Sequence, residues 1–391
     1  MHEATRYVLD HADELGAEAA PSDELGRITD RTVEILRASG GMKLLQAKDS
    51  GGHEAHPNDF MDWVMAVGMN HPSAGWIAGV VGIHPWEIAI ADPRLQKEVY
   101  GTDPETWIAS PYAPFGRAKP VDGGGYLFTG QWPYSTGTDH SEWVILGGMV
   151  TDADGKPVMP PDVRHFILPR ADYEIVGDSW NVMGLAGTGS KDVRMTDAFV
   201  PDYRVLDGIL VRDNTYSDRW RPGAPLYAMR FGVMFPFAIS AGTFGIARGA
   251  VRAARDHIEA RVSSQGSVSK ADPFVLAALA RAEADVEASI THVQSIIARF
   301  YDTVSAGGDI TVKDRLRFRV DQVRATDRAI EAVNELYRLM GSSSIQKGSP
   351  LERYWRDLQV ASTHVCNSRE PAYVAWGQEA FGGEIPPTAQ Y

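Results

Sequence analysis

The chain of 391 residues is long enough for two or three packed domains, and its 44% hydrophobic and 23% charged residues are typical of soluble proteins. The formal net charge of −13 argues against nucleic acid as a partner, because phosphate binding needs a basic face. Cys366 is the single cysteine, which excludes an intramolecular disulfide. The sequence shows neither a signal-peptide pattern nor an uninterrupted apolar stretch long enough for a bilayer, so we expect a cytoplasmic protein without a membrane partner.

Residues 1–104 are predicted to be mainly helical. One helix is expected over residues 23–39. A second helical stretch, residues 63–82, is interrupted by His71-Pro72-Ser73. The side chain of Ser73 is expected to cap the helix that follows, because a serine hydroxyl satisfies a free backbone N–H at a helix start.

Residues 105–212 are predicted to form a central β-domain. Glycine and proline are frequent here, and Gly123-Gly124-Gly125 is expected to form a turn before a strand with alternating Tyr126 and Phe128. Short apolar runs at 143–146, 165–168 and 198–200 indicate further buried strands. A compact β-barrel or sandwich accounts best for this pattern.

Residues 213–391 are predicted to return to long helices. Apolar residues recur every three or four positions over 275–300 and again over 316–340, and Gly341 is expected to end the second helix. Two consecutive amphipathic helices predict an antiparallel bundle whose apolar rows are core.

Several motifs are absent from the sequence. No GxGxxG follows a predicted strand, and there is no Walker A lysine motif, HExxH or GxSxG. Any reducing equivalents must therefore come from elsewhere. Asp103, Glu105 and Asp139 are scattered, so we interpret them as surface acids and expect no metal.

Two segments resemble the acyl-CoA dehydrogenase superfamily. GLAGTGSKDVRMTDAFVP at 184–201 is similar to its β-domain signature, and LERYWRD at 351–357 is similar to its C-terminal Arg-Asp segment. Length and region order agree as well, so the resemblance covers nearly the whole chain. It implies an α+β, mainly α fold with an N-terminal helical domain (1–104), a central β-barrel or sandwich (105–212) and a C-terminal four-helix bundle (213–391).

Three further stretches resemble one branch of that superfamily, the oxygenase components of group D two-component flavin-dependent monooxygenases. They are residues 75–86, ASPYAPFG at 109–116 and GQWPYSTGTDH at 130–140, and DQVRATDRAI around Arg324 adds to the likeness. They look most similar to the hydroxylase of 3-hydroxy-9,10-seconandrostatrienedione and, more distantly, to p-hydroxyphenylacetate hydroxylase. The resemblance implies a homotetramer that takes reduced FMN or FAD from a separate NAD(P)H:flavin reductase.

An enzyme of this kind reacts its reduced flavin with dioxygen and holds a C4a-hydroperoxyflavin until an aromatic substrate, here expected to be a phenol, arrives. Such a site must exclude water, accept a hydrogen bond from the flavin N5–H and donate one to the peroxide. It must also favour the phenolate, whose ring carbon is the nucleophile.

The resemblance places His84 and Ser110 on the substrate side, where they would polarise a phenol oxygen, and also places Trp86 and Tyr112 there. The alternative for His84 is a hydrogen-bonded core histidine, since a charged imidazole is costly in its apolar neighbourhood. His364 lies where some desaturases of the superfamily have a catalytic glutamate. An imidazole donates to a peroxide, which an ionised carboxylate cannot do. The alternative for His364 is a satisfied polar residue of the bundle.

Ser135 and Thr136, which follow Trp132, are expected beside the flavin N5 and pyrimidine edge; from spacing alone they are turn residues. Further cofactor contacts implied by the resemblance are Gly187, Thr188, Gly189, Ser190, Arg230, Arg261, Gly341 and Ser343. Arg261 would reach a neighbouring subunit's flavin, and the turn from Gly341 would take the FMN phosphate. For both arginines a solvated helix face is the alternative.

Other functions remain open at this point. The same flavin machinery would also oxidise an indole, sulfur or amine centre, and an acyl-CoA dehydrogenase or a non-catalytic flavin-binding relative would share the fold. The small residues Ala241, Gly242, Gly245, Ala247 and Gly249 allow close helix approach, which is consistent with subunit packing. Cys366 beside His364 is discounted as a nucleophile, because nothing else supports acyl transfer.

Overall fold

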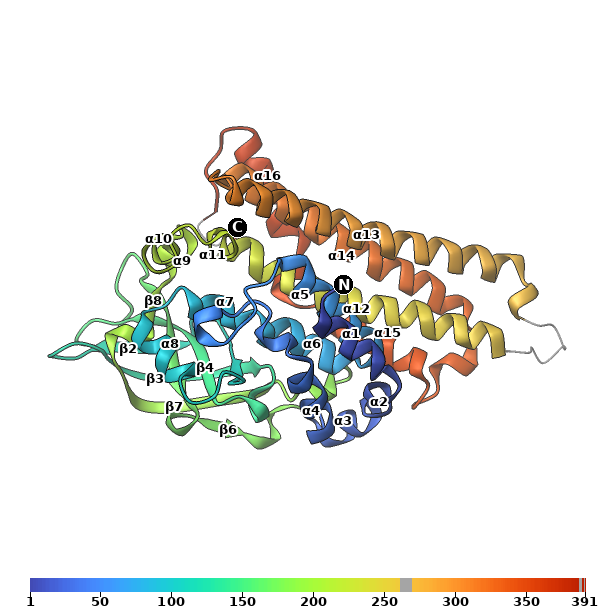
Figure 1. Cartoon of the computed structure of the whole chain (residues 1–391), viewed down its shortest axis with the longest axis horizontal. Coiled ribbons are helices and arrows are strands. Elements are labelled where there is room, and N and C mark those ends of the chain that lie inside the picture. The colour runs from blue at the N-terminus through green and yellow to red at the C-terminus, as the bar shows by residue number, and fades with distance from the viewer. Residues whose placement is uncertain (261–268, 387–388, 390) are drawn as a thin grey trace.

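A computed structural model describes residues 1–260, 269–386, 389 and 391. The chain folds in the expected order of helices, strands and helices (Figure 1). The helices before the sheet are α1 Glu3–Asp10, α2 Ala12–Ala17, α3 Ala19–Leu25, α4 Asp30–Ser39, α5 Pro57–Asn70, α6 Pro72–Gly82, α7 His84–Ala89 and α8 Pro93–Tyr100. The strands are β1 Ile108–Ala109, β2 Gly116–Pro120, β3 Tyr126–Ser135, β4 Trp143–Val150, β5 Val163–Pro169, β6 Glu174–Val176, β7 Lys191–Val200 and β8 Val205–Asp207. The later helices are α9 Gly208–Arg212, α10 Thr215–Trp220, α11 Pro225–Ala228, α12 Phe231–Ala260, α13 Pro273–Ser305, α14 Val312–Leu339, α15 Pro350–Ser362 and α16 Arg369–Ala380.

The N-terminal helices differ from the prediction in two details. The expected helix over residues 23–39 is two helices, because Gly26 adopts a left-handed φ of 62° and ends α3. Helix α6 is capped by His71, whose Nδ1 accepts from the Ala74 N–H at 3.3 Å, and not by Ser73. The Ser73 hydroxyl is buried, and no hydrogen-bond partner is found for it in the described part of the chain.

The β-domain is one hydrogen-bonded sheet with the strand order β6-β7-β3-β2-β4-β5-β8, and β1 pairs with β4. Most neighbouring strands are antiparallel, but β4 runs parallel to β1 and β2. The turn before β3 uses three glycines with φ of 92°, 100° and 92°, as the Gly123–Gly125 run predicts. The sheet has a core of its own that includes Phe128, Trp132 and Phe166.

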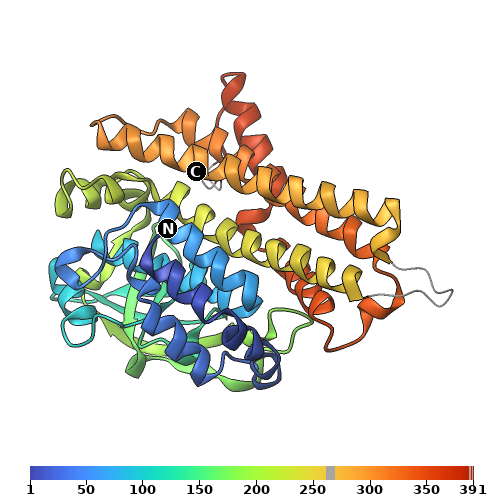
Figure 2. The same ribbon diagram turned by 45° about the vertical axis from the view of Figure 1, so that its right-hand side comes forward.

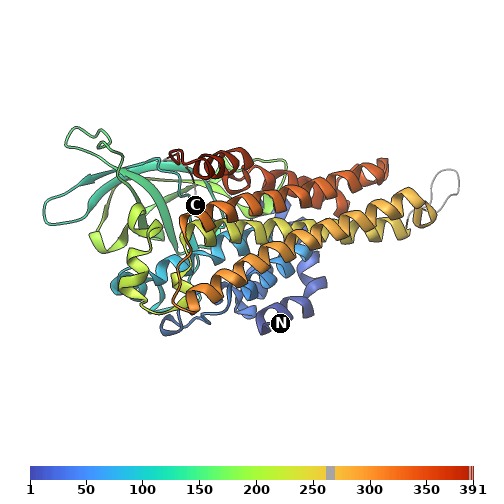
Figure 3. The same ribbon diagram turned by 90° about the horizontal axis from the view of Figure 1, so that it is seen from above.

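The C-terminal helices α12 to α15 pack on one another as a bundle, and α16 packs on α14. Seen from above, α12, α13 and α14 run side by side along the long axis of the molecule (Figure 3). The fold class predicted from the sequence, α+β and mainly α, is confirmed. The division at 104/105 and 212/213 stays a prediction.

Helices α5 and α6 pack directly on α12, so the N-terminal helices and the bundle share one hydrophobic core (Figure 2). The small-residue run in α12 makes this contact. A Cβ on Gly245 would lie 3.0 Å from Met65, and one on Gly249 would lie 2.1 Å from the Tyr354 ring. These glycines therefore serve packing within the protomer, which corrects the interpretation of the run as a sign of subunit contact.

One described helix, α12, is long and apolar enough to cross a membrane by composition alone. Within its most apolar 18-residue window, 78% of the residues are buried inside the protein. We therefore interpret α12 as the core helix of the bundle.

We expect Gly245→Ala to lower the free energy of unfolding by about 1–3 kcal/mol, because the added methyl meets backbone atoms of α5. The matched control is Gly377→Ala in α16, where an added Cβ meets nothing within 4 Å. Alanine there is expected to be neutral or to stabilise by up to about 1 kcal/mol. Urea unfolding of both variants checks this, and equal stabilities for the two would contradict the packing argument.

Candidate active site

His84 and Ser110 form a buried pair at the junction of α7 and the sheet. His84 is 0% exposed, and its Nδ1 bonds the backbone carbonyl of Ile108 in β1. Since a carbonyl only accepts, Nδ1 carries the proton and Nε2 is the acceptor. The Ser110 hydroxyl donates to Nε2 at 2.7 Å. Burial lowers the pKa of His84 to about 4, so the imidazole is neutral near pH 7.

Tyr112 lies beside this pair, as the sequence predicts, and it belongs to a network that the sequence interpretation missed. Its hydroxyl donates to Glu87 Oε2 at 2.5 Å, and His165 Nδ1 bonds Glu87 Oε1 at 2.5 Å. The ring centroids of His84 and Tyr112 are 5.8 Å apart. The signal for Glu87 was a lone carboxylate in the otherwise apolar stretch HPWEIAIA.

Aromatic side chains connect Tyr112 with His364. The Tyr112 and Phe235 ring centroids are 5.1 Å apart, and Phe235 and His364 are 6.1 Å apart. Phe231 stacks on Phe235 with centroids 5.6 Å apart. Trp76 of α6 meets the His364 ring edge at 5.6 Å. The two predicted catalytic histidines therefore lie along one continuous aromatic wall.

His364 lies in the turn after α15, and its Nδ1 accepts from the Cys366 N–H at 3.2 Å. In the neutral ring, Nε2 then carries the proton and is a donor. Burial, with a contribution from the positive charge of Arg319, lowers the pKa of His364 to about 4. The ring is therefore a neutral N–H donor near pH 7.

A buried polar network holds this turn in place. Arg319 is 3% exposed and donates to the Cys366 carbonyl at 3.1 Å. Gln322 donates to Ser240 at 2.8 Å, and Asn367 donates to the Ala361 carbonyl at 2.9 Å. Sequence reasoning missed this network, because its members come from α12, α14 and the segment after α15.

A second group of hydroxyls lies where β3 ends. Thr136 Oγ1 and Ser190 Oγ are 2.9 Å apart, and Ser190 Oγ and Thr188 Oγ1 are 2.8 Å apart. Ser135 is 0% exposed, and no partner for its Oγ is found among the described residues. An orphaned buried hydroxyl normally needs an explanation, and a polar edge of a bound cofactor supplies one. The adjacent turn at Gly137 packs against Val81 of α6.

Several other residues predicted to contact the cofactor bond to other residues of the chain. The Gly187 N–H donates to Asp23 at 3.3 Å, and the N–H groups of Thr188 and Gly189 donate to the carbonyls of Leu185 and Ala186. These amides are thus bonded within the chain, and their contact with a cofactor stays a prediction. Arg230 pairs with Asp309, in the segment between α13 and α14.

Both predicted tryptophans are core residues. Trp132 is 0% exposed and donates to the Gly147 carbonyl at 2.8 Å inside the β-domain core. Trp86 is also 0% exposed, donates to the Leu226 carbonyl at 2.8 Å and packs behind Phe231. Both indoles pack within the cores on either side of the site, and the direct cofactor and substrate contacts expected from the sequence stay predictions.

Gly341, with a φ of 72°, follows α14, and Ser343 lies in the short turn after it. Arg261 falls outside the described residues.

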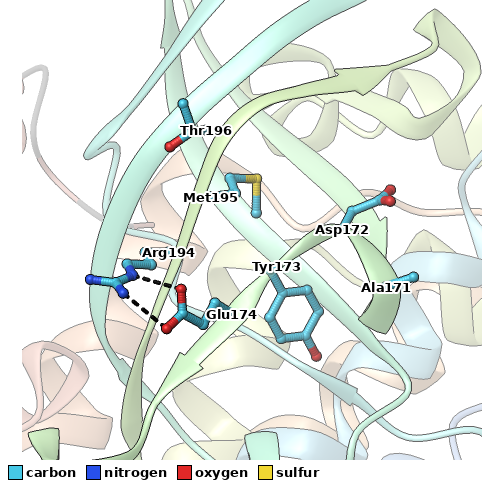
Figure 4. Close-up of a pocket in the computed structure, with 7 residues that line it drawn as sticks. All are labelled: Ala171, Asp172, Tyr173, Glu174, Arg194, Met195 and Thr196. Carbon is cyan, nitrogen blue, oxygen red and sulfur yellow. Dashed lines mark hydrogen bonds and ion pairs between the residues drawn. The ribbon is translucent and has the colours of Figure 1, made fainter.

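Two surface cavities share no residue with the His84–Ser110 pair or with Ser135. The first, of about 350 Å³, lies on the outer edge at β6 and β7, where Arg194 and Glu174 pair through two bonds of 2.9 Å (Figure 4). The second, of about 430 Å³, lies between α14 and the segment 362–370. In the described part of the chain no group of three or more His, Cys, Asp or Glu side chains converges on a metal position.

The fold and the site define a protein of the acyl-CoA dehydrogenase architecture with two neutral histidines joined by a row of aromatic side chains. The family model "Acyl-CoA dehydrogenase, C-terminal domain" matches residues 237–369. The chain is 43% identical over 363 residues to a pigment production hydroxylase of Rhodococcus erythropolis, covering 93% of this chain and 92% of that protein. It is 38% identical to the oxygenase subunit HsaA of a flavin-dependent monooxygenase from Rhodococcus jostii, covering 95% of this chain and 96% of that one.

A solved structure of 3-HSA hydroxylase from Rhodococcus sp. RHA1 superposes with a TM-score of 0.93 at 37% identity, covering 99% of both chains. A more distant relative, at 27% identity over 97% of this chain and 94% of the other, is the oxygenase component of an FADH2-dependent resorcinol hydroxylase from Rhizobium sp.. The chain belongs to the oxygenase components of flavin-dependent monooxygenases. The family predicted from the sequence is confirmed.

We expect His84→Asn to weaken the pH dependence of stability. The folded pKa of His84 is lowered from 6.5 to about 4, so the stability it contributes above pH 6.5 is lost as the pH falls toward 4. Asparagine keeps a donor for the Ile108 carbonyl but takes up no proton. Between pH 7 and pH 5 the variant should lose about 2 kcal/mol less than the wild type in urea unfolding. The control is His292→Asn, at a half-exposed position of α13. An equal loss of unfolding free energy between pH 7 and pH 5 in the wild type and both variants would contradict a neutral, buried His84.

Proposed function

We propose that this chain hydroxylates a phenolic compound at the aromatic wall between His84 and His364, with reduced FMN or FAD bound near the hydroxyl group at the end of β3. A separate NAD(P)H:flavin reductase supplies the reduced flavin, and the protein works as a homotetramer in the cytoplasm. The observation that carries the proposal is the His84–Ser110 pair, a neutral acceptor of fixed tautomer inside an apolar site.

The pair suits a phenol because the hydrogen-bond donor and acceptor roles of its two side chains are fixed. The Ile108 carbonyl holds the proton on Nδ1 of His84, and Ser110 donates its own proton to Nε2. Ser110 Oγ then presents lone pairs to the site and accepts from a phenol O–H. Partial transfer of that proton raises the electron density of the ring carbon to be oxygenated.

The residues at the end of β3 suit a flavin. Ser135 Oγ is buried and free for a hydrogen bond to the flavin N5 edge, and Thr136 lies beside it. When reduced and exposed to dioxygen, the bound flavin supplies the oxygen atom for transfer. His364 presents Nε2–H as a neutral donor at the other end of the aromatic wall, while Phe235 and Trp76 exclude water. Gly341, Ser343 and Arg261 remain candidates for contact with the flavin of a neighbouring subunit.

The reaction class is tested by reducing FMN chemically without oxygen, mixing it with the purified protein and adding oxygenated buffer in a stopped-flow spectrometer. We expect oxidised-flavin absorbance to return more slowly than for free flavin, because the site excludes water. Phenols such as resorcinol should raise the yield of hydroxylated product over hydrogen peroxide. Reoxidation at the free rate, or a yellow protein that an acyl-CoA reduces, would overturn the proposal.

Two serine variants separate the two halves of the site. Ser110→Ala should lower kcat/KM for a phenol by about 100-fold or more, with flavin reoxidation unchanged. Ser135→Ala should instead speed flavin reoxidation and raise the peroxide yield. The control is Ser179→Ala, whose hydroxyl bonds the Val176 carbonyl on the outer part of the β-domain. The same phenotype from both site variants would be inconsistent with separate substrate and flavin roles.

A further inference from the structure

Glu87 is a carboxylate buried beside the His84–Ser110 pair. It follows His84 by one turn of α7 and is 1% exposed. One oxygen bonds His165 Nδ1 and the other accepts from the Tyr112 hydroxyl, both at 2.5 Å. His165 comes from β5 and Tyr112 from the segment after β1, so three elements converge on one carboxylate.

The Glu87 side chain remains ionised despite its burial. Burial raises the pKa of the carboxyl, but the charge of His165 and the hydrogen bonds from His165 and Tyr112 outweigh it, so the pKa lies below its usual value. The titratable groups that face His84 are Glu87 on its own helix, Tyr112 and His165. Of these, Glu87 favours a positive charge on His84 and His165 opposes one.

The hydrogen bonds that Glu87 makes with His165 and Tyr112 do not by themselves require a negative charge at this position. A glutamine of the same shape has an oxygen to accept from His165 and an amide group to bond Tyr112. A buried carboxylate costs several kcal/mol of desolvation free energy that the neutral amide avoids. The negative charge of Glu87 pairs with His165, and it also favours a positive charge on His84.

We infer that Glu87 is a positioning residue that supplies the counter-charge for an imidazolium formed at His84. A bound phenol gives its proton to Ser110 Oγ while Ser110 gives its own proton to His84 Nε2. One O–H bond of the phenol breaks, an N–H bond forms at His84 and Ser110 is unchanged, so phenolate and imidazolium form together. This inference rests on the proposed function, because it presupposes a phenolic substrate.

The test uses 4-nitrophenol, whose ionised form is yellow, as a probe of proton transfer in the full-length protein as purified. Difference spectra over a pH series give the ratio of ionised to neutral bound probe. In the wild type we expect ionisation at a lower pH than in free solution. In Glu87→Gln the ratio at a given pH should fall about tenfold or more, because the counter-charge is lost. The matched control is Glu105→Gln, which removes the partner of Lys43 outside this network.

Glu87→Asp separates charge from shape. If the charge matters, Glu87→Asp retains more ionised probe than Glu87→Gln; if only shape matters, the order reverses and the inference is overturned. Should Glu87→Gln fail to fold, the triple variant Glu87→Leu, Tyr112→Phe, His165→Leu removes donors and acceptors together and leaves no buried group orphaned. It should show the same tenfold loss.

The remaining outcomes distinguish the inference from the proposed function. Equal ionisation of bound probe in the wild type and Glu87→Gln overturns the role of Glu87 and leaves phenol hydroxylation standing. A wild type that binds 4-nitrophenol without promoting its ionisation overturns both. Slow flavin reoxidation that is unchanged in Glu87→Gln is expected in the supporting case, because Glu87 lies on the substrate side.

Discussion

The close approach of α5 and α6 to α12 determines where everything else lies. A Cβ on Gly75 would lie 2.1 Å from Gly68, and one on Gly79 would lie 2.8 Å from the Ala238 carbonyl, so the backbones themselves are in contact. Helix α6 is therefore held between the bundle and the β-domain. One part of it meets the turn at Gly137 and another meets His364. The two halves of the site therefore both contact this one helix.

Burial then controls the protonation of the site. Burial lowers the pKa of His84 and of His364 to about 4, so both are neutral near pH 7 before substrate binds. Their tautomers are opposite. His84 is an acceptor at Nε2 because Nδ1 donates to a carbonyl, whereas His364 is a donor at Nε2 because Nδ1 accepts from a backbone N–H. A single backbone contact at each histidine thus gives the two side chains opposite hydrogen-bonding roles at Nε2.

This arrangement explains why a shared fold supports oxygenation here. Acyl-CoA dehydrogenase chemistry needs an ionised base at the substrate α-carbon, whereas His364 is a neutral donor. The wall between the histidines is aromatic, which keeps water from a reactive oxygen species. The charge at Glu87 is satisfied by Tyr112 and His165 and is 1% exposed, so it lies beside the aromatic wall without opening it to solvent.

The sequence by itself determined the order of elements and the family, because periodicity, glycine-rich turns and the 130–140 stretch are local patterns. It also identified His84, Ser110, Ser135 and His364 as candidates, through the resemblance. It did not show that Trp86 and Trp132 pack in the core, because an indole suits a core as well as a cofactor contact. It also did not show what the Gly187 amide and the α12 glycines contact, since those partners lie far away in the chain. Only the tertiary structure brought Glu87, Tyr112 and His165 together. Their hydrogen bonds join helix α7, strand β5 and the segment that follows β1, and such bonds leave no periodic signal in the sequence of any one element.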